Sequence, residues 1–591
     1  MRSSGTLSRV ARVLCGAENG DTRSFFVLAC RHCTHTERYL GVLGSRPKPM
    51  PSLVGALAFF TLGLVAHYRI RSERLKIALL LAVGIAMRVF VALQSPLVLQ
   101  DWPLNDDSHY YFTIARNIVH GFGVRHDSAH ITTGFQPLFL ILILPLFEVV
   151  HDKLFVINAV LLLQSAVGVC CALLLYRLAR FVGGAAVALV ALGIWATSAT
   201  LLTADLNGLE TNTSLCLLLA TLCLYVRDFV VGDASSTCAF ARLGAMCGLS
   251  FLARVDLGLL IPVLTGDLLL RGYRRTPRAM PFRQLVVMNA TAALAVSPWV
   301  LFNLITIRSV LPSSGQAVRF LAQAYGYRFI GGSGPAFEVG HAPLAYYLLT
   351  TLKAARESAA VLHGTFPLWA AVLCIGYAIA TSGQSFLLKQ RPLYFLGVFL
   401  GTLFLAYSWY IFGQWFLKRY LVPLTIGYVL IVVSAAREVV THATRKPPFW
   451  RHALMGLGMF ALACSMFRTL QDVSATVARD TPSGYYEAAV WVNENTPKQA
   501  LIGAYQTGIL GYYLERRFHG LDGKINVLSL DAMRSKSMDL YVKREKIDYL
   551  MDWPWILDDL FVKRARDPLF LAKQRKVRQG FYDMYELDSH P

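Results

Sequence analysis

Long apolar runs alternate with shorter polar stretches along most of the chain. A helix needs about 20 apolar residues to cross a bilayer, so this pattern predicts an all-α polytopic membrane protein with about 11 transmembrane helices. The predicted spans are 77–98, 154–175, 184–203, 212–226, 241–253, 256–270, 284–306, 358–380, 393–412, 416–436 and 451–469. A transmembrane region is therefore expected over 77–470.

Two stretches depart from this pattern. The apolar run 137–150 has only 14 residues, which suits an interfacial or re-entrant helix better than a crossing. After 470 the apolar runs shorten, and helix-like and strand-like segments alternate, with helices expected at 484–495, 507–514 and 530–543, strands at 500–504 and 547–551, and a turn at 519–523. This alternation predicts a small α/β domain over 471–591.

The N-terminal segment lacks such patterning. Residues 1–49 are polar and basic, and they are expected to be disordered, so either Met1 or Met50 serves as the start. In the following segment, 50–76, the apolar stretch 52–68 is one more membrane helix or a surface anchor, and a basic cytoplasmic loop follows it.

Charge supports the membrane interpretation and orients the chain. Lys and Arg number 57 against 36 Asp and Glu, and in a membrane protein this excess belongs to cytoplasmic loops that contact anionic lipid. No compact basic domain with stacking aromatics is present, so nucleic acid is excluded as a partner. With the most basic loops inside, the loop 99–153 and the C-terminal domain are predicted to lie outside the cytoplasm.

Histidine and cysteine do not predict a metal site. Cys30 and Cys33 lack a second ligand pair at zinc-finger spacing. Four histidines of the first outer loop also lack a tight ligand spacing: His109, His120, His126 and His130. No cofactor is predicted, and a divalent metal is left as an alternative that the sequence does not support.

The candidate chemistry begins with Asp106 and Asp107, which follow the first apolar span. An amphipathic helix is expected to follow them, with Tyr110 and Tyr111 on one face and an end near Gly121. Adjacent carboxylates at a membrane surface suggest a functional site. The alternative is that the run Asn105-Asp106-Asp107-Ser108 caps the helix, since Asn, Asp and Ser are favoured as N-cap residues.

Other charged residues are predicted on the same outer side. Asp205 and Glu210 lie between two spans and are either substrate-binding or loop-capping residues. Arg254 stands beside Asp256, and the two form a phosphate site or a structural ion pair. Arg419 begins a span, where it either binds phosphate or anchors the helix at the interface. Carboxylates to take a proton and cations to neutralise a phosphate are what sugar transfer from a lipid phosphate requires.

Several motifs taken together resemble bacterial integral-membrane glycosyltransferases of the GT-C superfamily. They are Asp106-Asp107-Ser-His-Tyr-Tyr, Thr132-Thr133-Gly134-Phe135-Gln136-Pro137-Leu138-Phe139, Leu206-Asn-Gly-Leu-Glu-Thr211, Phe251-Leu-Ala-Arg-Val-Asp256 and Arg419-Tyr-Leu-Val-Pro423. The resemblance extends over about 75–591. It implies the fold that protein mannosyltransferases, aminoarabinose transferases and arabinofuranosyltransferases share, and a polyprenyl-phosphate-linked sugar donor.

The resemblance also implies roles for individual residues. Asp106 falls on the catalytic acid/base, and Asp107 on its companion. Arg419 and Arg254 are expected at the donor phosphate. Substrate-binding positions are expected at Asp205, Glu210, Gln136 and Tyr110. Many relatives carry Asp-Glu where this chain has Asp-Asp, and Thr133 stands where relatives often have Asn.

The sequence therefore predicts an inverting glycosyltransferase of the cytoplasmic membrane, with its site facing the periplasm or exterior. Its partners would be a polyprenyl-phosphate-linked sugar, membrane lipid and an envelope glycan, lipid or protein as acceptor. A transporter or lipid flippase is the alternative, but the paired halves with matching interrupted helices that transporters show are not evident. A non-catalytic membrane scaffold is a third hypothesis.

Overall fold

The computed structural model describes residues 72–588, apart from 233, 276–281, 326–343, 384–385, 387–392, 412–417, 445–446 and 480–482. All described residues belong to one unit, Ser52–Pro591. The predicted disordered segment 1–49 and the apolar stretch 52–68 lie outside the described residues.

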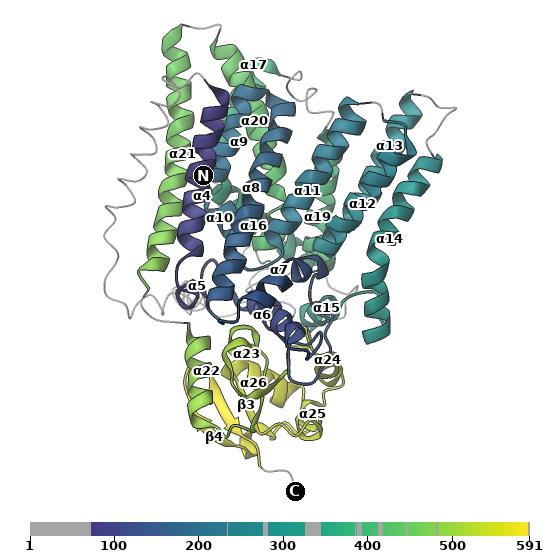
Figure 1. The fold of residues 1–591 in the computed structure, drawn as a ribbon, viewed down its shortest axis with the longest axis vertical. Coiled ribbons are helices and arrows are strands. Elements are labelled where there is room, and N and C mark those ends of the chain that lie inside the picture. The colour runs from purple at the N-terminus through teal and green to yellow at the C-terminus, as the bar shows by residue number, and fades with distance from the viewer. Residues whose placement is uncertain are drawn as a thin grey trace, which may run out of the picture. The chain divides into compact units, whose positions relative to one another are not determined.

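Helices make up the described chain as far as residue 477 (Figure 1). In order they are α4 (Glu73–Ala92), α5 (Pro96–Leu99), α6 (Asp106–Val119), α7 (Pro137–Val149), α8 (Phe155–Gly183), α9 (Ala185–Thr197), α10 (Ala199–Leu206), α11 (Thr211–Tyr225), η1 (Val226–Val231), α12 (Thr237–Ala253), η2 (Val255–Leu259), α13 (Leu260–Arg275), α14 (Phe282–Ile307), α15 (Ser313–Tyr325), α16 (Leu344–Thr365), α17 (Leu368–Ser382), α19 (Tyr394–Leu405), η5 (Ala406–Ile411), η6 (Lys418–Leu421), α20 (Leu424–Ala443) and α21 (Pro448–Val477).

The described helices confirm a mostly helical membrane protein. By length and composition, 6 of them could cross a membrane, or up to 8 if each of two bent pairs is one span. The bent pairs are Val187–Thr197 with Ala199–Leu206, at 63°, and Leu344–Thr365 with Leu368–Ser382, at 89°. Shorter apolar helices, α7 and α12 among them, fall below the length of a span. The number of about 11 stays a prediction.

Local sequence explains where these helices break. Ser198 separates α9 from α10, and its hydroxyl accepts a hydrogen bond from the Leu201 N–H at 3.0 Å, as a helix N-cap does. Pro367 stands between α16 and α17, where it lacks an N–H and restricts the residue before it. Helix α16 begins at Leu344, well before the start of the span predicted at 358–380.

A small mixed sheet with helices around it follows α21. Its elements are α22 (Gly484–Asn495), β1 (Leu501–Ala504), α23 (Gly508–Tyr513), β2 (Arg517–Gly520), α24 (Val527–Arg534), α25 (Met538–Arg544), β3 (Tyr549–Asp552), α26 (Pro554–Asp558), η7 (Asp559–Lys563), η8 (Leu571–Lys573), β4 (Arg575–Arg578) and β5 (Asp583–Glu586). The strand order is β2-β1-β3-β5-β4. Strand β1 pairs in parallel with β2 and β3, and β5 pairs antiparallel with β3 and β4.

This C-terminal region differs from the sequence expectation in three places. His519 and Gly520 lie in strand β2 rather than in a turn. The helix expected at 530–543 is two helices, α24 and α25, because the chain turns at Lys536, whose φ is 51°. Strands β4 and β5 were not predicted, since the edge strand β4 carries Arg575, Lys576 and Arg578 and lacks an apolar face.

Helix α6 packs between the transmembrane helices and the C-terminal region. One buried hydrophobic cluster joins its Phe112 to Phe139 of α7, Ile157 of α8, Ile502 of β1 and Tyr512 of α23. In Figure 1, α6 and α7 lie at the end of the long helices where α22 and α23 are also found. The first turn of α6, with its two carboxylates, is therefore held between the two regions.

Candidate active site

Helix α6 begins at Asp106, as the amphipathic pattern predicted, but its start is not capped in the predicted way. Asn105 is the N-cap residue, yet its side chain makes no capping hydrogen bond. The Ser108 hydroxyl instead donates to the Asn105 carbonyl at 2.6 Å. Asp106 and Asp107 thus occupy the first turn with their carboxylates directed to other elements.

Asp107 is held by two cations. Its Oδ2 accepts a hydrogen bond from Nη2 of Arg419 at 2.7 Å, and its Oδ1 lies 3.5 Å from Nζ of Lys524. Burial would raise the pKa of Asp107, but Lys524 and Arg419 outweigh this effect and hold that pKa well below its usual range. Asp107 is therefore an ionised group with little tendency to take a proton.

Asp106 is in a different environment. Its Oδ1 accepts a hydrogen bond from the Ile509 N–H at 2.7 Å, at the start of α23. The approach is close because residue 508 is glycine: a Cβ there would lie 2.0 Å from the Asp106 carbonyl oxygen. Burial raises the pKa of Asp106 to about 7, and the charge of Asp107 adds to this, while the Ile509 N–H opposes it. Asp106 can therefore exchange a proton near neutral pH.

The short helix η6 before α20 supplies Arg419, and Arg254 contacts its backbone. Besides Asp107, Arg419 contacts the Tyr420 hydroxyl at 3.1 Å. Arg254 donates to the Arg419 carbonyl at 3.2 Å and forms a buried ion pair with Asp256 at 2.6 Å. Its Nη2 also lies 3.1 Å from the Tyr407 hydroxyl. The Arg254 guanidinium is thus engaged by protein groups, which is the structural alternative considered for it.

Glu210 and Gln136 meet through a tyrosine. The Tyr111 hydroxyl donates to Oε2 of Glu210 at 2.9 Å and accepts from the Gln136 N–H at 2.9 Å. Gln136 directly precedes α7, and Glu210 directly precedes α11. Glu210 also contributes its negative charge to the surroundings of Arg419. Of the predicted binding residues, Glu210 therefore lies near Arg419, and Gln136 is linked to Glu210 through Tyr111.

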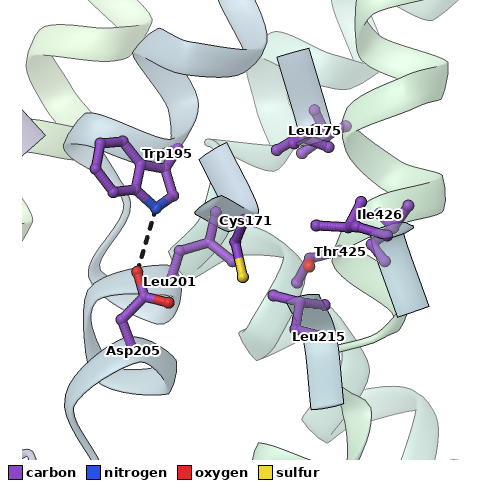
Figure 2. A pocket seen from close by; sticks show the side chains of 10 residues that line it. Cys171, Leu175, Trp195, Leu201, Asp205, Leu215, Thr425 and Ile426 are labelled. Carbon is purple, nitrogen blue, oxygen red and sulfur yellow. Dashed lines mark hydrogen bonds between the residues drawn. The ribbon is translucent and has the colours of Figure 1, made fainter. Parts of the chain in front are cut away.

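Asp205, by contrast, makes its contacts with other residues than Asp106, Asp107 and Arg419. It pairs with the fully buried Arg88 of α4, with Nε of Arg88 2.7 Å from its Oδ2. The same oxygen accepts a hydrogen bond from Nε1 of Trp195 at 3.2 Å (Figure 2). The small pocket at this position is lined mainly by apolar side chains and by neither Asp106 nor Asp107. The contacts of Asp205 are those of a structural ion pair between helices.

The C-terminal region adds residues that the sequence interpretation did not single out. Lys524 lies 3.5 Å from Asp107 and 3.9 Å from Asp522. Asp522 accepts a hydrogen bond from the Tyr110 hydroxyl at 3.1 Å, which explains the place of Tyr110. Asp522 and Lys524 both follow strand β2. Asp522 lies within the predicted turn 519–523, and Lys524 directly follows that turn. Nothing in their spacing relates them to residues 106–110, so only the folded chain reveals them.

Several buried polar atoms of the residues described in this section, and of the neighbouring Asn105, have no hydrogen-bond partner among the described residues. They are Oδ1 of Asn105, Oδ2 of Asp106, Oε1 of Gln136 and Nε of Arg419. Buried polar atoms are nearly always paired, so an unpaired group needs an explanation. A polar substrate that binds between these residues would supply the missing partners. We refer to Asp106, Asp107, Gln136, Glu210, Arg419 and Lys524 as the carboxylate–arginine cluster.

Comparisons with known proteins bear on the class of this protein. Residues 136–302 match the family model of the dolichyl-phosphate-mannose-protein mannosyltransferases. Among curated proteins, none matches the chain. The alternative of a transporter finds no support, because the matched family is one of enzymes.

Solved structures share the fold at low sequence identity. ArnT from Cupriavidus metallidurans, bound to undecaprenyl phosphate, is 13% identical with a TM-score of 0.52 over 86% of this chain and 97% of ArnT. The oligosaccharyltransferase of Archaeoglobus fulgidus, tethered with an acceptor peptide, is 14% identical with a TM-score of 0.54 over 89% of this chain and 75% of that enzyme. AglB from the same organism, in complex with an inhibitory peptide and a dolichol-phosphate, is 15% identical with a TM-score of 0.52 over 81% of this chain and 69% of AglB.

The solved structures show that the fold is that of ArnT and the archaeal oligosaccharyltransferase, and the family match shows that part of the chain is similar to a family of membrane glycosyltransferases. Within that class, the matched segment 136–302 relates the chain to the dolichyl-phosphate-mannose-protein mannosyltransferases. This segment starts at Gln136 of the carboxylate–arginine cluster and includes Glu210 and Arg254.

Proposed function

We propose that this enzyme transfers a sugar from a polyprenyl-phosphate donor to an acceptor hydroxyl at the outer face of the cytoplasmic membrane, with inversion at the anomeric carbon. The observation that carries the proposal is the unequal pair of carboxylates. The Oδ2 atom of Asp106 is buried and loss of solvent raises the pKa of this residue to about 7, while Asp107 is paired with Arg419 and Lys524. Two carboxyls whose surroundings separate their pKa values suit an acid/base role for one and an electrostatic role for the other.

The chemical step follows from these assignments. Asp106 takes the proton of the acceptor hydroxyl, and the oxygen attacks the anomeric carbon from the side opposite the phosphate. The bond between that carbon and the phosphate oxygen breaks, and polyprenyl phosphate leaves with the electron pair. Arg419 and Lys524 neutralise the negative charge that develops on the phosphate. Asp107 holds both cations in place until the donor arrives.

The proposals for the donor and for the acceptor rest on different observations. The related structures hold undecaprenyl phosphate in ArnT and a dolichol-phosphate in AglB, which supports a polyprenyl-phosphate donor here. The acceptor is proposed as an envelope glycan, lipid or protein that binds against the C-terminal domain beside Gln136 and Tyr110. Comparing lipid-linked sugars and envelope glycans in cells with and without the gene tests this proposal. Identical profiles would contradict it.

Arg419→Ala is expected to raise the apparent KM for the lipid donor more than it lowers kcat, because a cation at the phosphate contributes to binding the donor. Arg419→Lys keeps the charge but loses the planar fork, so an intermediate KM is expected. Initial rates with a purified polyprenyl-phosphate sugar at varied concentration measure both effects. Arg254→Lys is the matched comparison, because the Arg254 side chain contacts the carbonyl of Arg419 and not the Asp107 carboxylate. Unchanged donor kinetics in Arg419→Ala would return Arg419 to the role of an interface anchor.

The outer location of the site is tested by labelling single cysteines in a background without other cysteines. Exposed positions are available at His151 before α8, at Arg180 near its end and at Lys498 in the C-terminal domain. A membrane-impermeant thiol reagent applied to intact cells should label His151→Cys and Lys498→Cys but spare Arg180→Cys. Labelling after lysis checks that all three positions react. The reverse pattern would place the site in the cytoplasm.

A further inference from the structure

A second cluster of polar side chains lies where the loop after α6 meets the sheet. His130 of that loop, His519 of β2 and Glu545 at the end of α25 each direct one ligand atom to a common point, and these atoms lie within 4.8 Å of one another. Nε2 of His130 is 3.8 Å from Oε2 of Glu545, and Nδ1 of His519 is 3.9 Å from the same oxygen. None of the three belongs to the carboxylate–arginine cluster.

His519 is a buried group that lacks a partner for the atom facing this point. Its side chain is 6% exposed. Its Nδ1 has no hydrogen-bond partner among the described residues. A buried imidazole nitrogen without a partner is costly unless something occupies the space in front of it. The remaining carboxylate oxygen of Glu545 is already engaged by Arg544 at 3.0 Å, so only Oε2 is free to face the histidines.

A neighbouring carboxylate orients the imidazole of His130 so that its Nε2 can bind a metal. Its Nδ1 lies 2.8 Å from Oδ2 of Asp127, which favours the tautomer with hydrogen on Nδ1 and a lone pair on Nε2. A carboxylate that holds the far nitrogen of a histidine ligand is the usual outer shell of a zinc site. Asp127 is itself fixed, because its Oδ1 accepts the N–H groups of Ala129 at 3.0 Å and His130 at 2.7 Å.

We propose that His130, His519 and Glu545 bind a divalent zinc-class cation, with water in the fourth position. Two imidazole nitrogens and one carboxylate oxygen suit zinc rather than magnesium or calcium, which prefer oxygen ligands throughout. Tetrahedral zinc with bonds of about 2.0–2.2 Å places its ligand atoms roughly 3.3–3.6 Å apart. The separations of 3.8 and 3.9 Å exceed this spacing by a few tenths of an ångström, and the two histidine nitrogens, which lie within 4.8 Å of one another, must also approach when the ion binds.

The ion would fasten the first outer loop to the C-terminal domain. Strand β2 is an edge strand of the sheet. The loop already lies along it, with Ser128 and Phe518 exchanging hydrogen bonds at 2.9 and 3.0 Å. A metal bound by His130 of the loop and by His519 and Glu545 of the C-terminal domain would link the two at the end of this contact. The sequence did not predict it, because the three ligands are far apart along the chain.

The test uses the full-length protein in detergent, freed of metal with a chelator and then titrated with zinc chloride by calorimetry. We expect one tight site in the wild type, and a loss of affinity of at least tenfold in His519→Ala and in Glu545→Gln. Asp127→Asn should weaken zinc binding by about 10–100-fold, as loss of an outer-shell partner does. His120→Ala removes an exposed imidazole of the same loop and should bind zinc like the wild type.

Two further measurements keep the result interpretable if a variant folds poorly. Cobalt(II) added to the wild-type protein should give the visible absorption of a tetrahedral nitrogen–oxygen site, and zinc should displace it. Zinc should also slow amide hydrogen exchange in 127–131 and 517–520 of the wild type. The variant with both Asp106→Asn and Asp107→Asn should keep the zinc site, which separates it from any metal at the carboxylate–arginine cluster. No zinc binding by the wild type, or equal affinity in His519→Ala, would overturn the proposal.

Discussion

Asp106→Asn is expected to lower turnover by about 10²–10⁴-fold, the usual loss when a general base is removed. Asparagine keeps the size of the side chain, and its carbonyl oxygen can still accept the Ile509 N–H, so the contact with α23 persists. It cannot take a proton from the acceptor. The measurement is sugar transfer by the purified variant, with folding compared to the wild type by thermal melt.

The pH dependence gives a second readout of the same residue. A base must be ionised to act, and the pKa of Asp106 is raised to about 7. Activity per enzyme should therefore fall as the pH drops below about 7 and level off above it. In Asp106→Asn the remaining activity should lose this dependence. A wild-type profile that stays flat from pH 5 to 8 would assign the proton transfer to another group.

Asp107→Asn is the matched control variant, because it removes the neighbouring carboxylate while leaving Asp106 intact. Its effect on turnover should be smaller, since Asp107 positions Arg419 and Lys524 and takes no proton. If Asp107→Asn abolished turnover while Asp106→Asn kept it, the two roles would be exchanged. Near-normal turnover in both variants would leave Asp106 as a cap of α23 and refute the proposed mechanism.

The ion pair of Arg88 and Asp205 is expected to give the largest change in stability. Both side chains are buried, and Arg88 also donates to the carbonyls of Gly84 at 3.1 Å and Trp195 at 3.2 Å. Asp205→Ala leaves the guanidinium without its counter-charge, and breaking a buried pair in this way costs about 3–5 kcal/mol. The free energy of unfolding in mixed micelles measures this loss.

Two comparisons show whether the loss comes from the uncompensated charge. The double variant Arg88→Met with Asp205→Leu removes both charges and should recover most of the stability. Arg227→Ala breaks the ion pair with Asp228, in which the arginine is 65% exposed, and should change stability by less than about 1 kcal/mol. An Asp205→Ala variant as stable as Arg227→Ala would mean that Asp205 contributes by another route, such as substrate binding.

Periodicity predicted the fold well where the local sequence alone determines a helix or strand. Helix α22 was expected at 484–495 and is observed at Gly484–Asn495, because its apolar spacing and its preceding Thr-Pro are local features. The strand β4 depends on its neighbours instead. A charged edge strand such as Arg575–Arg578 is stabilised by pairing with β5, which no local pattern records.

The residues of the candidate site also differ in whether the local sequence could predict them. Asp106, Asp107 and Arg419 could be named from the sequence because each stands at the end of an apolar run, next to the predicted membrane surface. Lys524 and Asp522 could not, because their relation to α6 exists only after the C-terminal region has docked. Asp205 lies in the same short stretch as Glu210, yet the turn of the chain between α10 and α11 places the two carboxylates in different surroundings.

The contact of α6 with the C-terminal domain sets the order of events during synthesis. Asp106 meets its partner Ile509 across 403 positions, and Tyr110 meets Asp522 across 412. At a translation rate of about 5–20 residues per second, the ribosome needs about 20–80 seconds to reach those partners. During that interval α6 has emerged, but its carboxylates have neither α23 nor Lys524 beside them. With the roles proposed for Asp106 and Lys524, the growing chain would gain activity only after its last segment is made, and a ribosome that stalls after α21 would leave an inactive membrane protein.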